Sequence, residues 1–501
     1  MKKLLLCLTA FLTIGIANAQ FTDGLHSYTI VGTDAYLSGS TATGDVTFPE
    51  TANDGGTTYN VTGVHAAFNG GAGPGITDAT FPLSYKTYQA SCFRGLADVV
   101  NVTFIGGEDF GGKLFRNNGS LNSVVLPTTI TAWGTEIFSQ SSLSTIVLGN
   151  CPEINNRMFR DTNVTELILP ATMTAISASG WNNSSVTTLF CEGSTPATID
   201  AGWAGDATIM TAYVPDAAAV TAYGLADVWK DFAAILVVGN VGDTFSVADI
   251  DYRITSFGPN IEVEVAGSTL ATPVIPSTVN NGGITYTVTA IGASAFKNNA
   301  TITSIELPVT VTNIDNAAFQ AAANLSAVTF TTTSGIRNIA LRGFLQCASL
   351  TNVNEIISVL ETIGGLGTNG NGTFNSCNIT GTLTTPSTLT TSTATSIFRA
   401  NHNMIVADLS ASTLLTTLAG NFLFDNDGLT TVLLPPSLIE LSASSVRDNP
   451  LLSSIIIPST VTTYGTNVFK DNFAMLSVEV QNTTPVAIDA SVFDSIDLST
   501  A

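Results

Sequence analysis

The stretch ITSIELPVTVTNIDNAAF, from Ile302 to Phe319, decides the fold because its pattern recurs along most of the chain. Its apolar residues stand at fixed offsets, and Pro308 lies 11 residues before Phe319. The same interval recurs at Pro82 to Phe93, Pro127 to Phe138, Pro170 to Trp181, Pro435 to Val446 and Pro458 to Phe469. A chain of 501 residues with such a repeat predicts an elongated array rather than one compact core.

Each repeat predicts one coil of a mainly β solenoid. Side chains of a strand alternate between its two faces, so Ile305 and Leu307 point inward and Glu306 points outward. Pro308 ends the strand because it cannot donate a ladder hydrogen bond. Parallel pairing then stacks the coils about 4.8 Å apart. Each coil ends on an inward residue that we call the anchor, and the predicted anchors are Phe68, Phe93, Phe115, Phe138, Phe159, Trp181, Phe296, Phe319, Phe344, Phe374, Phe398, Phe424, Val446, Phe469 and Phe493.

An internal duplication divides the chain into two blocks. FTDGLHSYTIVGTDAYLSGS, from Phe21, resembles FSVADIDYRITSFGPNIEVEVAGS, from Phe245, and each copy leads into a run of repeats. We expect a first block over 20–238 and a second over 239–501. Residues 195–238 lack the repeat and contain an Ala-rich helix after Pro215, which predicts a short helical cap. The end of the second block resembles only the start of that cap, so its own cap is expected to be truncated.

The first 19 residues are typical of a secretory signal peptide. Lys2 and Lys3 precede an apolar run, and Ala17–Asn18–Ala19 forms a small-residue cleavage site. A secreted or cell-surface protein beginning at Gln20 is therefore expected. It would carry 14 basic and 38 acidic side chains, a balance that opposes binding to nucleic acid and to anionic lipid. No later apolar run is long enough to insert into a membrane.

The stretches SIELPVTVTNIDNAAF, IIIPSTVTTYGTNVF and YTVTAIGASAFKNN resemble the BspA-like leucine-rich repeat family of bacterial surface proteins. The resemblance extends from Phe21 to Ala501. It implies a leucine-rich-repeat solenoid with parallel strands, on a secreted or surface-attached protein. It also implies adhesion to host or matrix proteins or to other bacteria.

The family often has a cysteine three residues after the anchor, and Cys347 and Cys377 match it here. With five cysteines left after signal cleavage, we expect buried structural thiols rather than a disulfide framework. Cys191 is expected to be an inward strand residue. A ladder of polar side chains that satisfies backbone groups at the bend is predicted elsewhere at Asn118, Asn299, Asn401, Asp427, Asn449 and Asn472.

No motif of a metalloprotease, serine hydrolase, nucleotide site or zinc site occurs, so we predict neither enzymatic activity nor a cofactor. The DNDG at Asp425–Gly428 resembles part of a calcium loop. However, Leu423 and Leu434 occupy the first and twelfth loop positions, where oxygen ligands are required. We therefore interpret DNDG as a turn and predict no metal site.

The outward strand position equivalent to Glu306 is the predicted ligand-binding position. In four consecutive coils of the first block it is Val125, Val147, Ile168 and Phe190, which would form an exposed apolar ridge roughly 15 Å long. The alternative is that the ridge is covered or is an ordinary strand surface. The sequence thus favours a binding protein whose partner is a protein or a glycan. A structural spacer, or the non-catalytic part of a larger secreted protein, remains open.

Overall fold

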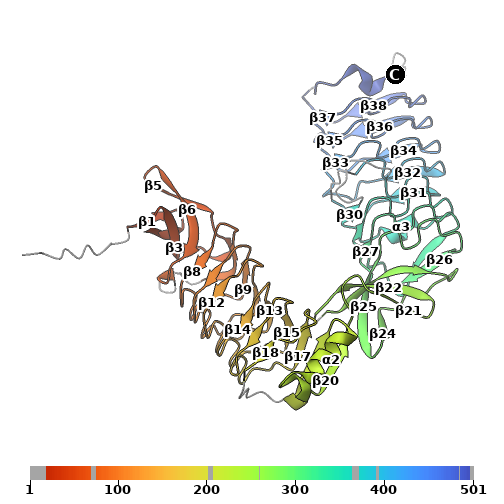
Figure 1. The fold of residues 1–501 in the computed structure, drawn as a ribbon. Coiled ribbons are helices and arrows are strands. Elements are labelled where there is room, and N and C mark those ends of the chain that lie inside the picture. Colours follow the sequence, from red (N-terminus) through yellow and green to blue (C-terminus); the bar gives the residue numbers. More distant parts are fainter. Residues whose placement is uncertain are drawn as a thin grey trace, which may run out of the picture. The chain divides into compact units, whose positions relative to one another are not determined.

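The computed structural model describes residues 19–68, 75–96, 98–200, 207–258, 260–363, 372–390, 394–484 and 486–496. They form two compact units, with the division between Gly239 and Asn240. Both units are stacks of coils connected mainly by parallel strand pairs (Figure 1). The predicted mainly β solenoid is confirmed. No helix of the described residues has both the length and the apolar composition to span a membrane.

Unit 1 opens with a small mixed module, in which β3 and β6 pair in parallel and the other pairs are antiparallel, and continues as two rows of parallel strands. The opening module consists of β1 (Gln20–Asp23), β2 (His26–Val31), β3 (Asp34–Ser40), β5 (Thr51–Asp54) and β6 (Thr57–Val64). The first row contains the longer strands β4 (Gly44–Thr47), β7 (Ile76–Phe81), β9 (Asn101–Phe104), β11 (Ser123–Val125), β13 (Thr145–Val147), β15 (Glu166–Leu169), β17 (Thr188–Cys191), β19 (Thr211–Val214) and β20 (Ala234–Val237). The second row contains β8 (Thr87–Tyr88), β10 (Asp109–Phe110), β12 (Ala132–Trp133), β14 (Glu153–Ile154), β16 (Ala175–Ile176) and β18 (Thr198–Ile199).

Unit 2 repeats this plan. Its opening module consists of β21 (Thr244–Val247), β22 (Ile250–Ser256), β23 (Glu262–Ser268), β24 (Thr278–Asn281) and β25 (Ile284–Ile291). The longer strands are β26 (Ser304–Leu307), β28 (Ala327–Phe330), β31 (Gly381–Thr384), β32 (Met404–Asp408), β34 (Thr431–Leu433), β36 (Ser454–Ile457) and β38 (Ser477–Val480). The short strands are β27 (Asn313–Ile314), β29 (Asn338–Ile339), β30 (Thr362–Ile363), β33 (Thr417–Leu418), β35 (Glu440–Leu441) and β37 (Thr463–Tyr464), and a helix, α3 (Val353–Ile356), interrupts the coils.

The alternation of apolar and polar residues produces the longer strands. In β26, Ile305 and Leu307 are buried, whereas Glu306 between them is only half-buried. The short strands were not predicted, because a coil was expected to contribute one strand. Two-residue segments such as β27 pair in parallel with the equivalent segments of the neighbouring coils. They form a second row of strands on the return segment of each coil. The coil is therefore closed by two rows of strands, not one.

The anchors are held by tight turns that hydrogen-bond from coil to coil. Around Phe319, the backbone N–H groups of Ala317, Phe319 and Ala321 donate to carbonyls of the next coil at 2.9, 2.8 and 2.8 Å. Ala317 and Ala321 both have a φ of +57°, in the left-handed region. Most coils have such left-handed residues two positions before and two after the anchor. These five residues, from two before to two after the anchor, are called the anchor turn below.

One predicted anchor is wrong. In the coil after Phe398, the anchor is Leu423, because its N–H donates to the Ser445 carbonyl at 2.8 Å as other anchors do. Leu423 is fully buried, whereas Phe424 is half-buried. The polar position three residues after the anchor is accordingly Asn426, which is buried, and not Asp427, which is exposed. The aromatic residue was preferred because most other anchors are aromatic, but the turn geometry selects its neighbour.

The segment predicted as a cap contains one helix, near the end of unit 1. Helix α2 (Ala217–Leu225) follows β19, and the Asp216 side chain caps its first turn by accepting from the Ala219 N–H at 2.7 Å. Tyr223 and Trp229 are buried, and their rings meet edge to face at 4.8 Å. Strand β20 then adds in parallel to β19. In unit 2, β38 pairs with β36, and the 3-10 helix η3 (Ala490–Phe493) follows it.

Candidate functional site

The outward positions of the longer strands form one face of unit 1, called the strand face below. Parallel register places Val125 beside Val147, and Ile168 beside Phe190. Before Val125 the row contains Thr47, Thr80 and Thr103, and beyond Phe190 it continues to Tyr213. No strand pairing among the described residues joins β13 to β15, so the row passes from one sheet to the next between Val147 and Ile168. The row of side chains follows the strands because parallel pairing keeps equivalent residues side by side.

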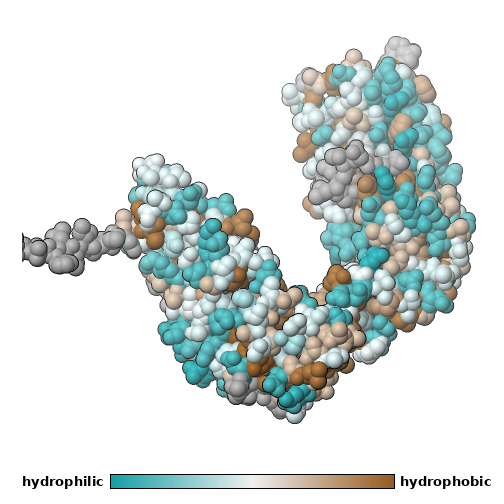
Figure 2. Space-filling model, in the orientation of Figure 1, coloured by the Kyte–Doolittle hydropathy of each residue, from teal (hydrophilic) through white to brown (hydrophobic). Residues whose placement is uncertain are grey.

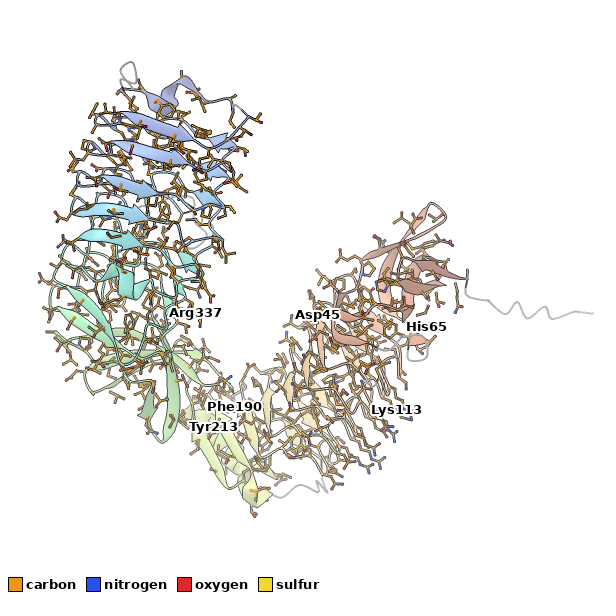
Figure 3. The ribbon with its side chains drawn as sticks, turned by 180° about the vertical axis from the view of Figure 1, so that it is seen from behind. Asp45, His65, Lys113, Phe190, Tyr213 and Arg337 are labelled. Atoms are coloured by element: carbon orange, nitrogen blue, oxygen red, sulfur yellow. The ribbon has the colours of Figure 1, made fainter. Side chains whose placement is uncertain are left out.

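The exposure of the predicted ridge changes along this row. Val125 and Val147 are 37% and 46% exposed, and Ile168 is half-buried. Phe190 is only 3% exposed, so the expectation of an exposed side chain at this position is wrong. Its ring stacks on that of Tyr213, with 4.9 Å between centroids and 13° between planes. The two residues are labelled near each other in Figure 3. Phe190 therefore packs against the strand that follows it instead of being free at the surface.

Two further residues, Tyr213 and Leu236, belong to the row and were not predicted. Register places Tyr213 beside Phe190 and Leu236 beside Tyr213, and both are half-buried. They lie in the segment that was assigned to the cap rather than to the repeat, although Pro215 directly follows β19 as Pro308 follows β26. Figure 2 shows brown, hydrophobic areas on unit 1 that are separated by polar surface. The apolar row thus runs from the middle of unit 1 to its cap.

Unit 2 carries a groove on its own strand face that the sequence did not predict. It encloses about 520 Å³ and is lined by Leu433 and Ile456, which are 43% and 50% exposed. Other coils of unit 2 have Glu306 and Glu479 at the same outward position, so the row of unit 2 is mixed rather than apolar. A second, largely apolar pocket of about 310 Å³ lies next to β38, between Ile457, Tyr464, Val480, Val486, Ile488 and Phe493.

Several polar positions after the anchors are structural, but Asn118 does not fit the predicted ladder, because its buried side chain has no hydrogen-bond partner among the described residues. Cys347 and Cys377 donate from Sγ to the carbonyls of the preceding anchors, at 3.0 and 3.1 Å. The Asn401 side chain does the same to Phe374 at 3.0 Å. Burial raises the pKa of the Cys347 thiol to about 12, so the reactive thiolate is rare at neutral pH. Cys191 is also buried, as predicted. These thiols are free and buried, which accords with the expected structural role.

One cluster of possible metal ligands occurs among the described residues, at His402, Asp425 and Asp427. Their ligand atoms lie within 4.8 Å of one another. The Nδ1 atom of His402 lies 2.9 Å from Oδ2 of Asp427. However, the Arg399 guanidinium lies 3.8 Å from Asp425 and already offsets its charge. His402 and Asp427 are solvent-exposed, which also weakens electrostatic attraction for a cation. The cluster is better described as part of a surface ion-pair network.

Several solved structures are similar to this chain at low sequence identity. A leucine rich cell surface protein from Faecalibacterium prausnitzii is 15% identical, covering 93% of this chain and 95% of that one, with a TM-score of 0.29. A leucine-rich repeat protein from Bacteroides ovatus is 13% identical, covering 91% and 94%, with a TM-score of 0.28. The pneumococcal vaccine antigen PcpA is 13% identical, covering 93% and 99%, with a TM-score of 0.29. A search among curated proteins finds no match.

A family comparison agrees with the repeats described above. The family described as BspA type leucine rich repeat region matches in six copies, over residues 66–187, 277–405, 366–475 and 406–501. These ranges contain the anchor turns and most strands of the two rows in both units. The chain therefore belongs to the BspA-type leucine-rich repeat family.

Proposed function

We propose that this is an extracellular binding protein that recognises another protein, in adhesion or matrix contact, through the strand face of unit 1. The observation that carries the proposal is the row of apolar outward residues that includes Val125 and Val147, which are 37% and 46% exposed. Contiguous apolar side chains at a protein surface are typical of interaction sites.

The surroundings of the row favour a macromolecular partner. The outward residues that flank it are polar, including Ser123, Thr145 and Glu166. An apolar centre with a polar rim is the usual composition of a protein–protein interface. Because each coil adds about 4.8 Å to the row, the face offers a long and shallow surface rather than an enclosed cavity. Such a surface suits a folded protein better than a small molecule.

The family supports a binding role in general terms. Leucine-rich repeat solenoids of this kind generally serve as non-catalytic binding scaffolds, and a structural relative is described as a cell surface protein. The expected signal peptide agrees with export of this chain. The specific partner is the part that the experiment must identify.

The test compares two double variants of the protein that starts at Gln20. Val125→Asp with Val147→Asp places two charges on the row. Leu83→Asp with Ile105→Asp is the matched control, because these side chains are 64% and 54% exposed but lie outside the outward row. Binding would be measured on immobilised collagen, laminin and fibronectin, and on whole bacterial cells.

We expect the first variant to lose at least tenfold in affinity for whichever surface the unmodified protein binds, while the control changes less than twofold. Circular dichroism would confirm that both variants are folded. Equal loss in both variants would contradict a site on the row. If the unmodified protein binds none of these surfaces but self-associates, the spacer function is favoured instead.

A further inference from the structure

The basic residues of unit 1 are concentrated on one part of its surface. Residues 20–239 contain seven Lys and Arg against 19 Asp and Glu. Five of the seven basic residues lie on the anchor turns, where the only acidic residues are Glu136 and Asp161. We call these five the basic strip: Arg94, Lys113, Arg116, Arg157 and Arg160. A strongly acidic unit therefore carries one locally positive face.

The fold aligns these residues in two columns. Arg94, Arg116 and Arg160 each follow an anchor directly, whereas Lys113 and Arg157 each lie two residues before one. The turns are fixed to one another by backbone hydrogen bonds, for example from the Lys113 N–H to Thr135 at 2.8 Å. At about 4.8 Å per coil, the four coils from Arg94 to Arg160 span about 14 Å. In Figure 3, Lys113 is labelled at an edge of unit 1.

The two acidic residues leave most of this positive charge uncompensated. Glu136 lies between two guanidinium groups, 2.6 Å from Arg116 and 3.6 Å from Arg157, and its side chain is only 16% exposed. Asp161 pairs with Arg160 at 3.1 Å. Arg94 and Lys113 are exposed, and neither forms an ion pair with a described residue. The strip thus presents more cations than the protein itself neutralises.

The composition of the strip indicates the chemistry of its ligand. Four of its five residues are arginines, whose planar fork suits sulfate, phosphate and carboxylate groups. The strip is two residues wide, and the acidic body around it would repel an extended anionic plane such as a membrane. The anchor rings Phe93, Phe115 and Phe138 are buried, so the anchors offer no stacking platform for nucleotide bases.

We propose that unit 1 binds a linear anionic polysaccharide along the basic strip. Sulfate or uronate groups of one glycan chain would bind successive coils, and the acidic remainder of the unit would confine the chain to the strip. The site is separate from the strand face, because it uses the anchor turns and not the outward strand positions. Its failure would leave the proposed protein-binding function untouched.

The test uses the protein from Gln20 onward, with heparin as the sulfated probe and hyaluronan as the carboxylated probe. The strip variant is Arg94→Gln, Lys113→Gln and Arg160→Gln, which spares the two arginines that hold Glu136. The matched control is Arg399→Gln, Arg447→Gln and Lys470→Gln, which removes the same charge from anchor turns of unit 2. Affinity would be measured by surface plasmon resonance at two salt concentrations.

We expect binding to at least one glycan, about tenfold weaker at 0.3 M than at 0.1 M NaCl because counterions are released. The strip variant should lose at least tenfold in affinity, and the control less than twofold. Heparin preference would identify sulfate as the recognised group, and equal binding would identify the carboxylate. The proposal is overturned if neither glycan binds, if both variants lose equally, or if single-stranded DNA or phosphatidylserine vesicles bind more tightly than either glycan.

Discussion

The anchor turns of the two units contain the same number of basic residues, but they differ in the acidic residues that can pair with them. Each unit contains seven basic and 19 acidic residues, and in each unit five of the basic residues lie on anchor turns. In unit 2, aspartates stand two residues after three successive anchors, and Arg447 pairs with Asp471 at 3.0 Å. In unit 1, the corresponding residues include Asn117 and Gln140, which carry no charge. Net charge per unit is therefore a poor guide to the charge of any one face.

The units also differ on the inner side of the same turns. In unit 2, three ladder asparagines, Asn426, Asn449 and Asn472, each accept from a backbone N–H of the preceding coil, as Asn449 does from the Asn426 N–H at 3.1 Å. In unit 1, Ser141 and Thr162 donate to the anchor of their own turn, at 2.7 and 2.8 Å. The asparagines couple neighbouring coils, whereas the hydroxyl groups stabilise single turns. Unit 2 should therefore be the more cooperative of the two along its axis.

The largest expected effect tests which residue is the anchor. Phe319→Ala removes a fully buried ring that stacks on Phe296 and Phe344, and should destabilise unit 2 by about 3–5 kcal/mol. Phe424→Ala removes a half-buried ring that lies 4.5 Å from the Arg399 guanidinium, and should cost about 1 kcal/mol. Urea unfolding would measure both. Similar losses would mean that Phe424 is an anchor after all.

A smaller effect should separate the two kinds of ladder. Asn449→Ala leaves the buried Asn426 N–H without its acceptor, which should cost about 1–3 kcal/mol. Ser141→Ala removes one donor to a carbonyl within its own turn and should cost about 1 kcal/mol. Hydrogen exchange would add a second distinction, since only Asn449→Ala should increase exchange in the coil of Leu423 as well as in its own. Exchange confined to the mutated coil in both variants would contradict the coupling.

The charge difference can be transferred between the units. Asn117→Asp with Gln140→Asp gives unit 1 the acidic residues that unit 2 has at the equivalent positions. Both residues have a φ near +60°, which aspartate tolerates better than most residues. Heparin affinity should fall about tenfold while thermal stability changes little. The neutral pair Asn117→Ser with Gln140→Ser is the control, and a comparable loss there would show that charge is not the cause.

The smallest effect concerns pH. Burial, and then the charges of Asp425 and Asp471, raise the pKa of Asp448, so it loses its charge at a higher pH than an ordinary aspartate. As the pH falls from 7 to 4, the anchor turns of unit 2 should become more positive. In the strip variant, heparin binding should therefore rise severalfold over that range. Adding Asp448→Asn should flatten the early part of the rise, and an unchanged profile would exclude this residue as the source.

The sequence predicted the solenoid because buried positions recur at fixed offsets, and a repeated offset is informative even when single residues vary. It failed where two apolar residues competed for one position. Phe422, Leu423 and Phe424 all fit an apolar pattern, and only the backbone hydrogen bonds of the turn identify Leu423 as the anchor. The short second row of strands was missed because two-residue segments such as Asn313–Ile314 have no periodicity to detect.

The candidate site was predicted less completely than the fold. The outward row was identified from the alternation of strand residues, but its exposure depends on contacts across strands. Phe190 is covered, and Tyr213 joins the row, because residues 23 apart become neighbours only when the coils stack. The basic strip was detectable in principle, since its residues share two positions relative to the anchors. Counting charges over the whole chain concealed it.

The backbone hydrogen bonds between anchor turns also determine how the molecule would respond to tension. These hydrogen bonds and the parallel strand pairs both connect one coil to the next. A force applied along the axis would therefore act first on the hydrogen bonds of a terminal coil. Phe296 and Phe319 are 23 residues apart, and that length of chain reaches about 80 Å when fully extended. A coil that occupies about 4.8 Å of the stack would thus release many times its own height. A surface protein built this way would act as an extensible tether that lengthens coil by coil under load.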